Sequence, residues 1–219
     1  MSLPNLNQII PKERAQALVL SFAFCALIAV LAIVATKHMP KVEASEFVEG
    51  VHYSILPMAT TQEPEVKMFY TPYCQPCAMI HTPLRSMTER TDATFKEVPI
   101  KTGYLGQELQ EVIITAEAQG VGKKYLQQLL KLIHDKKGAG PTSREDLAQL
   151  LESCGGNADE FRKGCSATLE KVAELDRLTK QYYVRATPTI IVNGNKQLHL
   201  QSVNSFDELE ELLNTLIEA

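Results

Sequence analysis

Cys74 and Cys77, two cysteines three residues apart, are the residues whose type and spacing could most directly do chemistry. The run Val66–Tyr70 before them is rich in β-branched and aromatic residues and predicts a strand, Thr71-Pro72 predicts a turn, and an amphipathic run then predicts a helix. Residues three apart are neighbours on a helix surface, so the two sulfurs can form a disulfide. The sequence therefore predicts a dithiol that can open and close.

The predicted helix start gives the two cysteines different roles. Cys74 lies at the first turn, where unpaired N–H groups and the positive end of the helix dipole stabilise a thiolate and lower the pKa of the thiol. We therefore predict Cys74 as the nucleophile and Cys77, one turn further in, as the resolving thiol. Pro76 suits the first turn because its missing N–H breaks no hydrogen bond there. Gln75 and Pro76 form the dipeptide that tunes the redox equilibrium.

A C-x-x-C motif alone is also compatible with half a zinc site or a structural disulfide. A second motif, from Ala186 to Gly194, favours redox chemistry. Thr187-Pro188 is predicted to open an edge strand, a short apolar run follows, and Asn193-Gly194 is a hairpin signal. This pattern is typical of the second half of a thioredoxin-type fold.

Together, the strand, the C-x-x-C helix, a long helical run and the Thr187-Pro188 strand resemble the DsbA family of exported thiol-disulfide oxidoreductases, over roughly residues 46–219. The resemblance implies an α/β thioredoxin fold with an inserted all-helical domain. It also implies a cis peptide bond at Thr187-Pro188, beside the cysteines, where extended substrate backbone binds. Tyr73 is expected to line the same surface. No cofactor is implied.

The same resemblance implies partners: exported proteins with thiols, unfolded or folding, and a DsbB-like membrane quinone oxidoreductase that reoxidises the dithiol. This sequence departs from the family in its dipeptide, because Gln75-Pro76 lacks the histidine of the most oxidising members. A proline before the second cysteine is found in the reducing thioredoxins, and Thr187 resembles isomerases and reductases. The departures predict a less extreme oxidant. A reductase or isomerase, and a membrane-tethered chaperone with a structural Cys74–Cys77 disulfide, remain as alternatives.

An N-terminal segment, residues 15–36, is free of formal charge and long enough as a helix to cross a bilayer. It exceeds the usual length of a signal-peptide core, which favours an uncleaved anchor, whereas Val42-Glu43-Ala44 would suit cleavage before Ser45. We therefore expect either a single-pass protein of the bacterial inner membrane with its catalytic domain in the periplasm, or a soluble periplasmic protein if residues 1–44 are removed. A disulfide donor needs such an oxidising compartment.

The expected organisation has five parts. Residues 1–14 form a tail, 15–36 the anchor or signal, 37–62 a tether with a first short strand, 63–102 and 180–219 the thioredoxin-like domain, and 103–179 the inserted helical domain. A strand at Thr94–Ile100, parallel to the first, completes a right-handed βαβ unit. A final helix, Ser205–Glu218, is predicted to bury Phe206 and its leucines. With a net charge of −4 and no basic block, the chain lacks the electrostatic footprint of a nucleic-acid-binding protein.

Four further residues, two cysteines, a histidine and a glutamate, could have either a structural or a functional role. Cys154 and Cys165 are predicted to form a structural disulfide within the helical domain, because Gly155-Gly156-Asn157 allows the chain to turn back. A second redox pair is the alternative, and a zinc site would need both cysteine pairs to converge, so no metal is predicted. His81 is predicted as a partly buried structural histidine or as a charge near the Cys74 thiolate, and Glu97 as a proton acceptor near Cys77.

Overall fold

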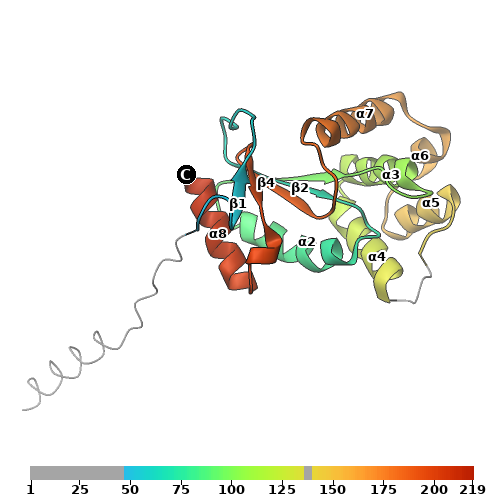
Figure 1. Ribbon diagram of the computed structural model, residues 1–219. Coiled ribbons are helices and arrows are strands. Elements are labelled where there is room, and N and C mark those ends of the chain that lie inside the picture. The colour runs from blue at the N-terminus through green and yellow to red at the C-terminus, as the bar shows by residue number, and fades with distance from the viewer. Residues whose placement is uncertain (1–46, 136–139) are drawn as a thin grey trace, which may run out of the picture. The chain divides into compact units, whose positions relative to one another are not determined.

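A computed structural model of the protein describes residues 47–135 and 140–219. The predicted anchor or signal at 15–36 and the first part of the tether, residues 37–46, lie outside the described residues. Within them, the strands form one mixed sheet in the order β1-β5-β4-β2-β3, and none of the helices that this part of the chain forms has the length and apolar character to cross a membrane. The fold is a thioredoxin-like α/β fold (Figure 1).

The sheet is built around a fully buried central strand, β2. β2 pairs in parallel with β3 and antiparallel with β4, so the predicted parallel βαβ unit is confirmed. Burial on both faces explains why the sequence of β2 is rich in large apolar residues. The strands are β1 (Tyr53–Ile55), β2 (Glu65–Tyr70), β3 (Thr94–Pro99), β4 (Thr189–Val192) and β5 (Lys196–Leu198).

Two helices cover one face of the sheet: α2 (Gln75–Thr88) and α8 (Phe206–Glu218). Both lie on the same side of the sheet in Figure 1 and contact each other. Their apolar faces join Val66, Met68 and Tyr70 of β2 in one hydrophobic cluster. Burial of these side chains is the main force that holds α2, and therefore its first turn, against the sheet.

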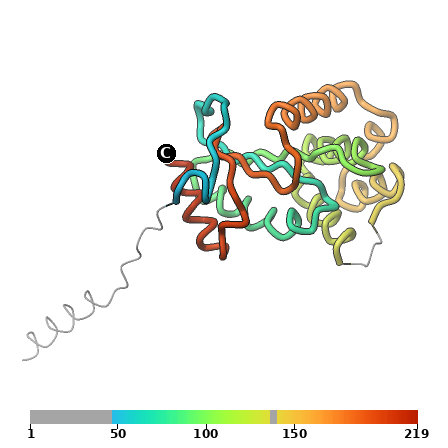
Figure 2. Tube along the Cα trace, viewed as in Figure 1, coloured from blue at the N-terminus to red at the C-terminus, as the bar shows by residue number. Residues whose placement is uncertain are grey.

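In its described residues, the region between β3 and β4 forms helices joined by loops, as predicted. These helices gather at the end of the sheet away from β1 and α8 (Figures 1 and 2). α7 leads back to the sheet, where Leu175, Leu178 and Tyr182 pack with Phe69 and Val98 on the second face. The helices are α3 (Gly106–Ala118), α4 (Gly122–Asp135), α5 (Arg144–Ser153), α6 (Asp159–Lys163) and α7 (Ser166–Gln181).

Two sequence predictions, about the strand after Pro188 and about Phe206, differ from the structure. β4 is an interior strand between β5 and β2, so the prediction of an edge strand at Pro188 is wrong. Pro188 directly precedes the first residue of β4, where its missing N–H takes no bond from the ladder. Phe206 is 50% exposed rather than buried, because it stands at the first residue of α8. The predicted Asn193-Gly194 hairpin turn is confirmed, with both residues at positive φ.

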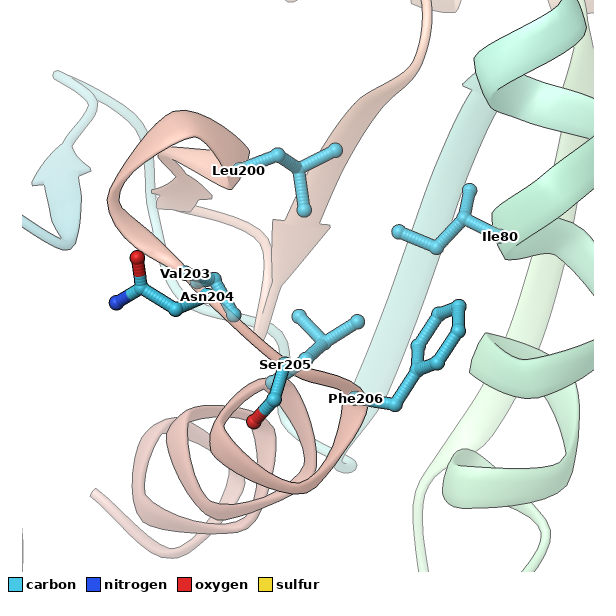
Figure 3. A pocket seen from close by; sticks show the side chains of 7 residues that line it. Ile80, Leu200, Val203, Asn204, Ser205 and Phe206 are labelled. Carbon is cyan, nitrogen blue, oxygen red and sulfur yellow. The ribbon is translucent and has the colours of Figure 1, made fainter.

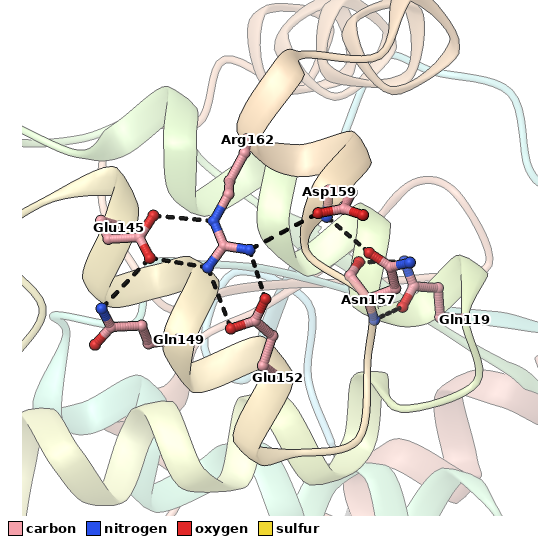
Figure 4. A network of polar contacts seen from close by, with 7 residues as sticks. All are labelled: Gln119, Glu145, Gln149, Glu152, Asn157, Asp159 and Arg162. Atoms are coloured by element: carbon pink, nitrogen blue, oxygen red, sulfur yellow. Dashed lines mark hydrogen bonds and ion pairs between the residues drawn. The ribbon is translucent and has the colours of Figure 1, made fainter.

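The predicted disulfide between Cys154 and Cys165 is also wrong, since the structure holds both as free thiols, Cys154 buried and Cys165 partly exposed. The chain between them does not simply turn back, because it forms α6 before it reaches α7. Ion pairs connect α5 and α6 instead (Figure 4): the Arg162 guanidinium lies 2.8 Å from a carboxylate oxygen of Glu145 and 2.5 Å from one of Glu152.

Candidate active site

Cys74 is the N-cap residue of α2, and Cys77 lies in the first turn of that helix. The two form a disulfide with their Cα atoms 5.2 Å apart. The backbone N–H of Cys77 donates a hydrogen bond to Sγ of Cys74 at 3.2 Å. A free N–H of the first helical turn therefore points at the sulfur that would hold negative charge in the reduced protein, which is the arrangement that stabilises a thiolate.

Burial distinguishes the two sulfurs. Cys77 is 1% exposed, whereas Cys74 is partly exposed and the intervening Gln75 and Pro76 are exposed. An incoming thiolate therefore reaches Cys74 first, because nucleophilic attack on a disulfide sulfur requires access to it.

The loop before β4 lies against Cys74. Thr187-Pro188 is a cis peptide bond, as the family resemblance implies. The carbonyl oxygen of Thr187 lies 3.4 Å from Sγ of Cys74, although the two residues are far apart in sequence. Thr189 fixes the loop, because its hydroxyl donates a hydrogen bond to the Ala186 carbonyl at 2.8 Å. An acceptor group of the backbone is thus held beside the reactive sulfur.

The inserted helices hold the segment that leads into Cys74. The hydroxyl of Tyr73 donates a hydrogen bond to the Pro141 carbonyl at 3.4 Å, and Nε2 of His134 lies 2.8 Å from the Pro72 carbonyl. Burial of its hydroxyl raises the pKa of Tyr73, yet the side chain is 40% exposed. Tyr73 therefore presents ring surface next to the cysteines while its hydroxyl anchors the loop.

Behind Cys77, the interior of the site is charged. His81 is buried and its Nε2 is bonded to the carboxylate of Glu97, which also accepts a hydrogen bond from Arg85 at 2.5 Å. Burial opposes the ionisation of Glu97, but the hydrogen bond and charge of His81 and the Arg85 guanidinium outweigh it and lower the pKa of Glu97 to about 2. His81 is thus a buried, paired histidine, as the structural interpretation predicts, and the partners of Glu97 are His81 and Arg85 rather than Cys77.

An apolar cavity of about 280 Å³ adjoins the active-site helix. Ile80, one turn beyond Cys77, points into it from α2, and Leu200, Val203 and Phe206 point into it from the segment that enters α8, whereas the polar ends of Asn204 and Ser205 turn away (Figure 3). No pattern in the sequence predicts this cavity, because its walls come from segments more than a hundred residues apart.

The zinc alternative finds no support in the structure. Within residues 47–135 and 140–219, no group of three or more His, Cys, Asp or Glu side chains is placed to hold a metal ion. The partly exposed disulfide at the start of α2 is suited to thiol-disulfide exchange at Cys74 and Cys77.

A thioredoxin-like fold with a dithiol at a helix N-terminus and a cis-proline loop beside it defines a thiol-disulfide oxidoreductase. The model of the DSBA-like thioredoxin domain matches residues 35–214. The chain belongs to this family.

Relatives and solved structures agree with the family assignment. The chain is 27% identical over 169 residues to the thiol:disulfide interchange protein DsbA of Pseudomonas syringae pv. tomato, covering 75% of this chain and 78% of the relative. It is 28% identical over 160 residues to DsbA of Pectobacterium carotovorum, covering 69% and 76%. The fold is similar to that of Pseudomonas aeruginosa DsbA, with a TM-score of 0.68 and 22% identity over 78% of this chain and 93% of the other. The protein is a DsbA-like thiol:disulfide oxidoreductase.

Proposed function

We propose that the protein is an oxidant that donates its Cys74–Cys77 disulfide to exported proteins. A substrate thiolate attacks Sγ of Cys74, the Cys74–Cys77 bond breaks, and Cys77 leaves as a thiolate that takes up a proton. A second thiolate of the substrate then attacks the mixed disulfide, so that the substrate gains a disulfide and Cys74 is released as a thiolate. The observation that supports this order most strongly is the partly exposed Cys74 sulfur, which accepts the Cys77 N–H at 3.2 Å.

Thr187, Pro188 and Tyr73 are proposed to bind the substrate. The Thr187 carbonyl lies 3.4 Å from Sγ of Cys74, so an extended chain that hydrogen-bonds along this loop would bring its own cysteine to the reactive sulfur. A solved structure of Proteus mirabilis DsbA, with a TM-score of 0.68 and 17% identity over 80% of this chain and 100% of the other, contains a non-covalently bound peptide. In this protein the cavity beside Ile80 offers a place for an apolar side chain of such a peptide.

Each turnover leaves Cys74 and Cys77 as a dithiol, so the oxidant must be regenerated. We propose a DsbB-like membrane quinone oxidoreductase for this step, by analogy with the family. The proposed location is the periplasm, with residues 15–36 as an inner-membrane anchor, because a stable disulfide donor requires an oxidising compartment. The proposed division into a thioredoxin-like domain, 63–102 with 180–219, and an inserted helical domain, 103–179, follows the order of the elements.

Trapping tests the proposed mechanism. In Cys77→Ser the lone Cys74 thiolate can still form a mixed disulfide by attacking a substrate disulfide, and no Cys77 thiolate is present to displace the substrate from it. We expect Cys77→Ser to accumulate disulfide-linked complexes with exported proteins in the cell, visible without reductant on a gel. The matched control, Cys74→Ser with Cys77→Ser, should accumulate none. Absence of complexes with the single variant contradicts the mechanism.

Two features favour the opposite function, in which the protein reduces or isomerises the disulfides of its substrates. They are Gln75-Pro76 between the cysteines and Thr187 before the cis-proline. The redox state in the cell separates the two functions. Rapid alkylation of thiols in intact cells should find Cys74 and Cys77 mainly oxidised if the protein donates disulfides, and mainly reduced if it reduces or isomerises them. A chaperone function without exchange would instead leave full activity in a variant with both cysteines changed to alanine.

A further inference from the structure

One face of α2 connects the dithiol to a group of buried charges. Cys77, His81 and Arg85 are spaced four residues apart, so they lie one above the other on this face. Cys77 is 1% exposed and His81 is 6% exposed. Glu97 of β3 lies opposite and is bonded to both His81 and Arg85. Any change in the charge of this group is therefore felt at Cys77 through protein rather than through water.

Glu117, on α3 of the inserted helices, is a further member of the group. Glu117 and Glu97 line one groove, and two carboxyl groups can share a hydrogen bond only if one of them holds a proton. Burial, hydrogen bonding to Glu97 and the negative charge of Glu97 raise the pKa of Glu117 to about 7, although Arg85 and Lys171 oppose the rise. The proton therefore resides on Glu117 in acidic solution and leaves near neutrality.

A groove of about 770 Å³ gives this proton a path to solvent. Both Glu97 and Glu117 line it, between β3 on one side and α7 on the other. Arg85 of α2, Glu97 of β3 and Lys171 of α7 act on the carboxyl group of Glu117, and its charge acts on Tyr70 of β2. The groove is also lined by Lys67, Lys96 and Glu174, and His81 is bonded to Glu97. Tyr70 is fully buried and the structure gives its hydroxyl no hydrogen-bond partner.

We propose that Glu117 is a positioning residue for the redox reaction: the proton it shares with Glu97 sets the charge behind Cys77 and, through it, the equilibrium between the Cys74–Cys77 disulfide and the dithiol. Reduction transfers two electrons from two substrate thiols, which become a disulfide. One of their protons goes to Cys77, which becomes a thiol, and the other goes to solvent, so Cys74 is left as a thiolate. The reduced form thus has one more negative charge than the oxidised form. Ionised Glu117 repels that charge and favours the disulfide, whereas protonated Glu117 does not.

The test is the equilibrium of the full-length protein with glutathione from about pH 5.5 to 8.5. We expect the equilibrium constant for reduction of Glu117→Gln to equal that of the wild type at the acidic end, where Glu117 already holds its proton. At the basic end it should exceed the wild-type value several-fold, because the variant lacks the negative charge that repels the Cys74 thiolate. Glu174→Gln, which removes a carboxylate from the same groove without touching Glu97, should follow the wild-type pH profile.

The two equilibrium constants for reduction, of Glu117→Gln and of wild type, are compared at each pH. The proposal is overturned if their ratio is constant over the pH range or equal to one throughout. Circular dichroism at each pH shows that the variants are folded. Should Glu117→Gln fail to fold, the wild type alone decides the question, because coupling is reciprocal: reduction of the dithiol must raise the pKa of Glu117. Infrared titration of the carboxyl groups in both redox forms measures this, and identical titrations contradict the proposal. Trapping of substrates by Cys77→Ser tests the proposed exchange at Cys74 separately. Its result does not depend on whether Glu117 influences the redox equilibrium.

Discussion

At the scale of single residues, the asymmetry between Cys74 and Cys77 determines how the site can react. Cys74 is partly exposed to an incoming thiolate and receives a backbone N–H, whereas Cys77 is 1% exposed. The residues between them, Gln75 and Pro76, are exposed and donate no charge to the sulfur. The stability of the thiolate therefore depends on the helix N-terminus, and the dipeptide offers the simplest position at which to change it.

Pro76→His tests the role of the dipeptide. A protonated imidazole at this position in the first turn would stabilise the Cys74 thiolate and therefore the reduced form. We expect the equilibrium constant for reduction by glutathione to rise about ten-fold, which corresponds to about one pKa unit. Pro76→Ala separates loss of the proline ring from gain of the imidazole and should change the equilibrium less. Equal values for the two variants would show that charge in the dipeptide has no influence.

At the scale of elements, local sequence signals determine where the helices begin, and helix starts position both the cysteines and the insertion. α5 begins with a capping box: Ser143 accepts a hydrogen bond from the Asp146 N–H at 3.1 Å, and the Asp146 carboxylate accepts one from the Ser143 N–H at 3.0 Å. The apolar side of α5, with Leu147 and Leu151 fully buried, then packs in the main core. The helix is thus specified twice, by its cap and by its buried face.

Ser143→Ala removes this cap. We expect it to lower the free energy of unfolding by about 1 kcal/mol, because the N–H of Asp146 loses its partner. Ser153→Ala, at the last residue of the same helix, is the matched control and should have a smaller effect. Chemical denaturation followed by circular dichroism gives both values, and an unchanged midpoint for Ser143→Ala would show that the cap does not contribute to stability.

Such local signals explain which elements the sequence predicts. The turn at Asn193-Gly194 and the helix start at Cys74 depend on residues that are close in sequence, and the structure has both. Tertiary packing determines the position of β4 inside the sheet, the helix α6 between Cys154 and Cys165, and the groove that Glu117 and Glu97 line together. No pattern in the sequence near these residues indicates the outcome, so the predicted edge strand and disulfide were wrong.

At the scale of the whole molecule, the site is assembled from distant parts of the chain. Cys74 comes from the βαβ unit, the Thr187-Pro188 loop from the strand after the helical insertion, and Pro141, which accepts the Tyr73 hydroxyl, from the insertion itself. The family resemblance predicts the first two because both are conspicuous motifs. The contacts made by the insertion could not be predicted, since they join loops and helices through single hydrogen bonds.

The N-terminal segment gives a prediction for the molecule in its cell. Residues 15–36 carry no formal charge and are expected to remain as an anchor. We expect the protein to stay in the membrane pellet after extraction at alkaline pH, and its N-terminal residues to be present when the purified protein is sequenced. Recovery in the soluble fraction, with an N-terminus near Ser45, would instead show that the segment is a cleaved signal.

The most direct test of the account is the ionisation of Cys74 in the reduced protein. The ultraviolet absorbance of the thiolate, followed against pH and compared with Cys74→Ser to isolate the contribution of this sulfur, gives its pKa. If the N-terminus of α2 stabilises the thiolate, the midpoint should lie below about pH 7. A midpoint near about 8.5, the value of an ordinary cysteine, would contradict the claim that the helix activates Cys74.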